Sequence, residues 1–135
     1  MNLRISNIRF GFTLLLITTV FGGMALGSTF DAQSVQEGNH LLDLARFYMR
    51  EGHSHGAFIC FFNLFVGLII NHLNLSENLK KIGSYAAMAA IFLPIALLSK
   101  GLAGAPNDFP PFGIIGVLGM FIALVILILG AFKTK

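Results

Sequence analysis

Long uncharged apolar runs alternate with short polar segments along this chain. The runs cover residues 10–30, 56–75, 82–98 and 112–132. A helix rises about 1.5 Å per residue, so a run of about 17–25 residues can cross the roughly 30 Å hydrocarbon core of a bilayer. All four runs fall within that range. The pattern therefore predicts an all-α, integral membrane four-helix bundle, in a single transmembrane domain over residues 1–135.

The polar segment between the first two runs carries a helical pattern of its own. Over residues 33–50, apolar side chains recur at helical spacing, and Asp43, Arg46 and Arg50 occupy the other face. This pattern predicts an amphipathic helix that lies on the membrane surface or caps the bundle. Gly52 follows it and predicts a break before the second span, because glycine weakens a helix interior.

Local signals mark the ends and bends of the later spans. Ser76 is typical of a helix N-cap and predicts a short amphipathic connector over 77–81. Pro94 lies inside the third span and should kink it, because proline has no backbone N–H to donate. The fourth span begins with three glycines spaced three residues apart, which predicts close approach of a neighbouring helix or of a flat ligand. These glycines are Gly113, Gly116 and Gly119.

Composition supports the membrane class. Hydrophobic residues make up 56% of the chain and charged residues 11%, with a mean hydropathy of +0.80. Soluble domains carry about 25% charged residues. The expected partners are therefore the lipid bilayer and other membrane protein subunits or a second copy of the chain, and not nucleic acid.

The placement of the charges predicts an orientation. One side of the membrane would receive six basic residues against one acidic residue, and the other three basic against five acidic. Basic residues accumulate on the cytoplasmic side. Both termini are therefore expected in the cytoplasm, and a bacterial inner membrane is the expected location. A cleaved signal peptide ending near Ala25-Leu26-Gly27 is the alternative for the first run, for which a retained helix is expected.

The sharpest candidate for chemistry is His53-Ser54-His55, at the start of the second span. In one interpretation, His55 points into the bundle and ligates haem iron, copper or zinc, and His53 and His40 supply further ligands. Residues two apart on a helix lie about 200° apart, so the pair can share a ligand only if the chain is irregular at His53. In the other interpretation, both histidines are interfacial residues that bind water or lipid headgroups.

Two further polar residues lie within or beside the second span. Asn63 lies near its middle, so its amide must hydrogen-bond inside the bundle, to Ser84, Tyr85 or a ligand. His72 lies at the cytoplasmic boundary and is interpreted as interfacial. The predicted spans contain no carboxylate, which disfavours ion transport. The sequence also lacks a CxxC motif and a nucleotide-binding glycine loop, and no enzyme activity is expected of the chain on its own.

Residues 53–63 resemble one helix of subunit I of the haem-copper oxidases and nitric oxide reductases, where a histidine at the outer start ligates the low-spin haem. The chain is also similar to small four-span membrane proteins with an HxH motif after a glycine-rich segment such as 23–27. The resemblance implies His55, and then His53, as the residue that faces haem or metal. A second axial ligand would have to come from another side chain or a second copy, so complete oxidase chemistry is excluded for this chain alone. The side chains in question are those of His40, Met24, Met88 and Met120.

These observations predict a small membrane-embedded accessory or redox protein that binds haem b or a metal ion near the outer face through His55. The alternative is a structural subunit or assembly factor of a membrane complex that binds no cofactor. A protein that binds lipid or another small molecule is the third hypothesis.

Overall fold

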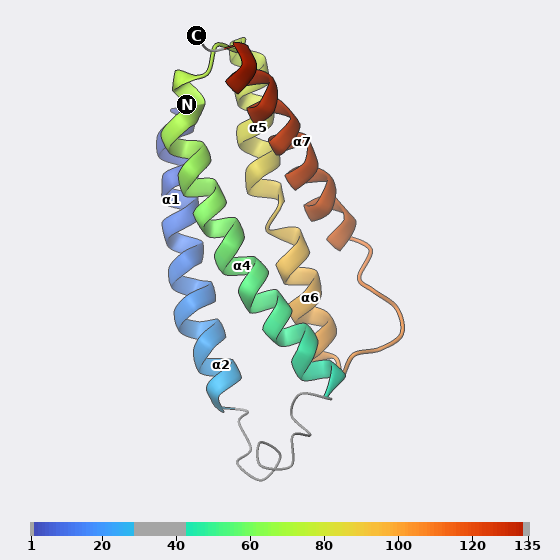
Figure 1. The fold of residues 1–135 in the computed structure, drawn as a ribbon. Coiled ribbons are helices and arrows are strands. Elements are labelled where there is room, and N and C mark those ends of the chain that lie inside the picture. Colours follow the sequence, from blue (N-terminus) through green and yellow to red (C-terminus); the bar gives the residue numbers. More distant parts are fainter. Residues whose placement is uncertain (1, 29–42, 134–135) are drawn as a thin grey trace.

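The computed structural model describes residues 2–28 and 43–133, and these residues form helices joined by loops (Figure 1). The elements in chain order are α1 (Leu3–Leu15), the π-helix η1 (Leu16–Gly22), α2 (Gly23–Ser28), α4 (Leu44–Ile69), the 3-10 turn η3 (Ile70–His72), α5 (Glu77–Ala89), α6 (Phe92–Leu102) and α7 (Gly113–Lys133). They build four helices long and apolar enough to cross a membrane. The prediction of an all-α protein with four such helices is confirmed.

The four long helices alternate in direction. The start of α1 and the end of α7 lie at one end of the bundle, here called the terminal end (Figure 1). The end of α2, the start of α4 and the end of α6 lie at the opposite end, here called the loop end. α4 packs against α1 on one side and α6 on the other, and α7 packs against α5 and α6. The first helix therefore packs mainly against α4, with a smaller contact to α5.

The first two spans begin earlier than the sequence predicted. The first helix starts at Leu3 rather than near residue 10, because Asn2 caps it. The second starts at Leu44, where the Asp43 carboxylate accepts the N–H groups of Ala45 and Arg46 at 2.9 and 3.3 Å. The described part of the predicted amphipathic segment therefore belongs to α4, and residues 33–42 of it lie outside the described residues.

The predicted helix break at Gly52 is wrong. α4 is continuous from Leu44 to Ile69 and contains Gly52 in its buried face. A Cβ atom at this position would lie 2.6 Å from Leu98 Cγ and 3.0 Å from the backbone oxygen of Pro94. Glycine is therefore needed here because α6 lies against the α4 backbone, a close-packing role that small residues often have between apolar helices.

The third span is interrupted where proline predicted a kink. α5 ends at Ala89 and α6 begins at Phe92, and Pro94 follows two residues later. Proline cannot donate to the carbonyl of Ala90, and Leu93 N–H donates to that oxygen instead, at 3.2 Å. Ser76 caps α5 as predicted, because its hydroxyl accepts the N–H of Leu79 at 3.4 Å. The connector predicted over 77–81 is the first part of α5 rather than a separate element.

The buried apolar cluster lies toward the terminal end, where α1, α4, α5 and α7 meet. It comprises Leu3, Phe62, Val66, Ile70, Ala87, Ala123 and Leu127. The glycines of α7 allow close helix approach, as predicted. A Cβ at Gly116 would collide with the backbone nitrogen of Leu93, and one at Gly119 would lie 2.7 Å from Ala86 O. These glycines therefore face α5 and α6.

Candidate functional site

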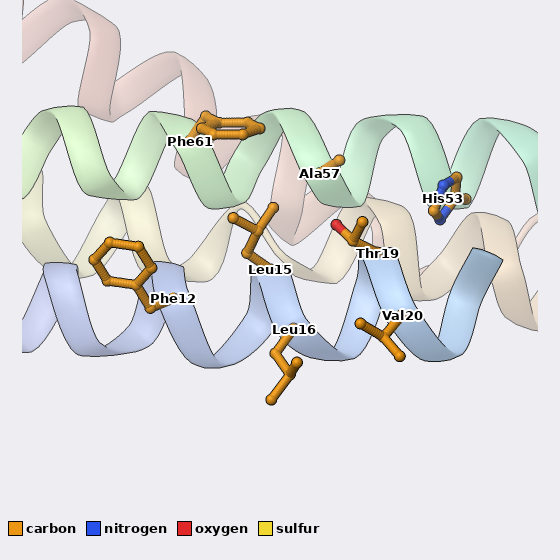
Figure 2. Close-up of a pocket in the computed structure, with 8 residues that line it drawn as sticks. All are labelled: Phe12, Leu15, Leu16, Thr19, Val20, His53, Ala57 and Phe61. Carbon is orange, nitrogen blue, oxygen red and sulfur yellow. The ribbon is translucent and has the colours of Figure 1, made fainter. Parts of the chain in front are cut away.

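A groove of about 530 Å³ runs between the first helix and α4 (Figure 2). Its lining is apolar except for one threonine and one histidine. The lining residues are Phe12, Leu15, Leu16, Thr19, Val20, His53, Ala57 and Phe61. His53 stands at the end nearer the loop end of the bundle, and the two phenylalanines stand at the other. Eight residues separate His53 from Phe61, so the α4 side of the groove is about 12 Å long.

The His53 ring is held by the backbone of the opposite helix. Its Nδ1 lies 2.8 Å from the carbonyl oxygen of Thr18. A carbonyl oxygen only accepts, so Nδ1–H donates in this hydrogen bond. A Cβ at Gly22 would lie 2.9 Å from Nδ1, whereas one at Gly23 would lie 3.9 Å from Cε1. Gly22 therefore leaves the space in which the ring sits.

The opposite helix is unusual at this point. The carbonyl that accepts from His53 belongs to η1, a π-helix over Leu16–Gly22. π-Helical turns are rare and often lie at functional sites. Thr18 itself is buried, and its hydroxyl donates to Leu14 O at 2.8 Å and lies 3.7 Å from Cys60 Sγ. The Thr18 side chain therefore contacts α4 at Cys60, about two helical turns from His53.

His55 lies on a different face of α4 from His53. α4 is regular at both positions, so the irregular chain that would let the two rings share a ligand does not occur. The His55 side chain is 44% exposed, its Nδ1 donates to the backbone oxygen of Glu51 at 2.9 Å, and the Glu51 carboxylate lies 3.7 Å away. The expectation that His55 points into the bundle is therefore wrong. Gly116 and Gly119 of α7, which could also have faced a flat ligand, contact α5 and α6.

Asn63 lies in a closed network of buried polar groups that joins three helices. Its Oδ1 accepts from Asn7 Nδ2 at 3.0 Å, and its Nδ2 donates to the backbone oxygens of Ile59 and Ala87 at 3.0 and 2.9 Å. Asn7 also pairs with Ser84, whose hydroxyl donates to Asn7 Oδ1. Asn7, Asn63 and Ser84 are all 0% exposed. The predicted hydrogen bonding of Asn63 inside the bundle is confirmed, but the predicted partners Ser84 and Tyr85 are wrong, because the side-chain partner is Asn7.

None of the other candidate ligands that the structure describes joins His53 in the lining of the groove. His40 lies outside the described residues, and His72 is exposed on η3, far along the bundle from the groove. Met24, Met88 and Met120 are not among the residues that line the groove. In the part of the chain that the structure describes, no group of three His, Cys, Asp or Glu residues is placed to hold a metal ion.

Sequence reasoning missed three residues of these sites. Thr18 contributes through its backbone oxygen, which any residue carries, and its small polar side chain in an apolar run was the only signal. Gly22 directly precedes the glycine-rich segment 23–27, and nothing in the sequence indicated that it would contact His53. Asn7 lies ahead of the predicted first span, and the early helix start brings it into the bundle.

Comparisons of the chain with protein family models, with curated proteins and with solved structures return no match.

Proposed function

We propose that this protein is a small integral membrane protein that holds haem b in the groove between the first helix and α4, with His53 as an axial ligand. One observation carries the proposal. His53 Nδ1–H is held by the Thr18 carbonyl at 2.8 Å, which leaves Nε2 as the nitrogen with a free lone pair. Histidines that ligate metals usually donate their other ring N–H to a carbonyl or carboxylate in this way.

The shape and polarity of the groove support a flat apolar ligand. Its side along α4 is about 12 Å long, and its lining is apolar apart from His53 and Thr19. The aromatic side chains of Phe12 and Phe61 lie at the end opposite His53 (Figure 2). Haem iron takes imidazole as an axial ligand, and when bound it supplies one-electron redox chemistry. The protein would then serve as an accessory or redox subunit of a membrane complex.

The ligand set favours His53 over His55 and haem over copper or zinc. The exposed ring of His55 is held to its own helix and is absent from the lining of the groove. Structural zinc takes four protein ligands, and copper sites take three or more. Haem iron needs one protein nitrogen, because the porphyrin supplies four.

The charge distribution supports the orientation with both termini in the cytoplasm. Arg4 and Lys133 lie at the terminal end, with Lys80 and Lys81 near the start of α5. The loop end would then face the periplasm, and His53 would lie near that face. Reporter fusions after Lys81 and after Lys133 should read as cytoplasmic, and one within residues 105–108 as external. A cytoplasmic signal from 105–108 would contradict this orientation.

The absorption spectrum of protein purified from a haem-replete host tests the haem proposal. We expect a Soret band and a pyridine haemochrome of b type. His53→Ala should abolish both, and the matched variant His55→Ala, two residues away, should retain both. A wild-type protein without haem would contradict the proposal and leave the cofactor-free structural subunit as the function. Loss of haem in His55→Ala with retention in His53→Ala would move the site to His55.

A further inference from the structure

We infer that His53 offers its groove ligand an electron pair and not a proton, so the site takes apolar molecules that bring an electron-pair acceptor. Such an acceptor is a metal centre in a flat ring or the hydrogen of a hydroxyl group. The inference rests on the groove of the proposed function but does not require that the ligand be haem.

The tautomer of the ring is the first step. A neutral imidazole carries one N–H and one unprotonated nitrogen. The partner of Nδ1 is the Thr18 carbonyl oxygen, which has no hydrogen to give, so the N–H of the ring is on Nδ1. Nε2 is then the acceptor, and among the described residues no hydrogen bond reaches it. A ligand with only acceptor groups, such as a carbonyl or a carboxylate, finds no proton at Nε2, and the Thr19 hydroxyl is the one other side-chain donor that lines the groove.

The local backbone keeps the ring in this state. The Thr18 carbonyl is positioned by η1, which the Thr18 hydroxyl anchors through its 2.8 Å hydrogen bond to Leu14 O. The ring fits because Gly22 lacks a Cβ, which would lie 2.9 Å from Nδ1. Real Cβ atoms do not come this close, so any other residue at position 22 would move the ring away from the carbonyl. Gly22 is thus a positioning residue that acts through His53.

The lining of the groove indicates that the rest of the ligand is apolar. Apart from His53 and Thr19, the lining is entirely of Phe, Leu, Val and Ala side chains. Phe12 and Phe61 are more than half exposed, so the groove is open at its surface. A molecule dissolved in the bilayer could enter it sideways and place one polar group at His53. Haem b fits this description through its iron, and an isoprenoid-type quinol fits it through its hydroxyl groups, whereas the oxidised quinone has only carbonyl acceptors.

Nitrogen-15 NMR of the histidine-labelled protein without ligand tests the tautomer. The signals of His53, assigned by their loss in His53→Ala, should report protonated Nδ1 and unprotonated Nε2. Gly22→Ala should change this signature, and the matched neighbour Gly23→Ala, whose Cβ would make only ordinary contact with the ring, should not. Protonated Nε2 in the wild type would overturn the inference. So would an unchanged signature in a folded Gly22→Ala variant.

Ligand titrations of the wild-type protein in detergent test the ligand class and need no variant. The probes are hemin, a decyl-substituted quinol and the corresponding oxidised quinone. We expect the quinol to bind at least about tenfold more tightly than the quinone, which is about 1.4 kcal/mol. Equal affinity of the two, or tighter binding of the quinone, would overturn the inference. Binding of the quinol but not of hemin would sustain it while contradicting the haem proposal, and binding of none of the three would overturn it.

Discussion

The two halves of the interface between the first helix and α4 are built in opposite ways. In the half near the terminal end, Asn7 and Asn63 are fully buried and hydrogen-bond to each other. In the half near the loop end, the first helix widens into η1, and a groove lies beside the His53 ring. The first half is closed around polar groups that satisfy one another. The second half contains a ring nitrogen that the described residues leave without a hydrogen bond.

Backbone packing follows the same division. Near the terminal end, a Cβ at Gly67 would lie 2.9 Å from the backbone oxygen of Arg4, and one at Gly11 would lie 2.9 Å from that of Cys60. The helices there touch backbone to backbone. Near the loop end, the corresponding neighbours of Gly22 and Gly56 are side chains, those of His53 and Thr18. The comparison indicates that the half near the terminal end holds the first helix in place, and the half near the loop end is where we propose that the ligand binds.

The largest effect on stability is expected from Gly67→Val. The Cβ of the new side chain would lie 2.7 Å from Ile8 Cγ1 and 2.9 Å from the Arg4 backbone oxygen. A backbone oxygen cannot be moved by a change of side-chain rotamer. Overpacking of this kind costs about 1–3 kcal/mol, and we expect the upper part of that range. Unfolding in mixed detergent micelles measures it. Gly27→Val is the control, because its Cβ would meet nothing within 4 Å. Equal free energies of unfolding for the two variants would contradict the close backbone packing near the terminal end.

A smaller loss of unfolding free energy is expected when the hydrogen bonds of Asn63 are removed. Asn63→Leu leaves the carbonyls of Ile59 and Ala87 and one Asn7 hydrogen bond without their partner. Interhelical hydrogen bonds between apolar helices are worth about 0.6 kcal/mol on average and up to about 1.7, so we expect a loss of about 1–2 kcal/mol. A double-mutant cycle with Asn7→Leu should give a positive coupling energy. Additive losses would show that the two amides act independently. Any bound chromophore should remain.

His53→Ala should lower the free energy of unfolding by less, about 0.5–1 kcal/mol, because it removes a single hydrogen bond to a carbonyl. The same variant should lose the ligand altogether. We expect this combination, a small loss of stability with a complete loss of ligand binding, for a residue in the half near the loop end. A loss of stability as large as that of Asn63→Leu would indicate that His53 is mainly structural.

The smallest effect is expected from His55→Ala. Its ring is 44% exposed and bonds only to its own helix, to the backbone oxygen of Glu51. Exposed substitutions usually change stability by less than about 0.5 kcal/mol. Ligand binding should match the wild type. A binding defect in this variant, measured beside His53→Ala under the same conditions, would show that the site extends around α4.

The sequence predicted the architecture more completely than it predicted the candidate site. Apolar runs predicted the four helices, and Pro94 predicted the interruption of the third, because both signals are local. The sequence favoured His55 over His53, whereas the structure places His53 in the lining of the groove and His55 on the exposed face of α4. Which side of a helix meets a neighbour depends on how the helices are rotated about their axes. In an apolar helix that rotation leaves little trace in the sequence.

The sequence alone determined that this chain makes long apolar helices, because hydrophobicity and backbone hydrogen bonding act within each segment. It also determined that Asn63 must be satisfied inside the bundle, since a free amide is costly there. Only the tertiary structure decided its partner, Asn7, which lies 56 positions away in the chain. The tertiary structure likewise placed Gly22 and the Thr18 carbonyl against His53. Close packing of glycine-bearing faces sets these contacts, and it acts between segments distant in the chain.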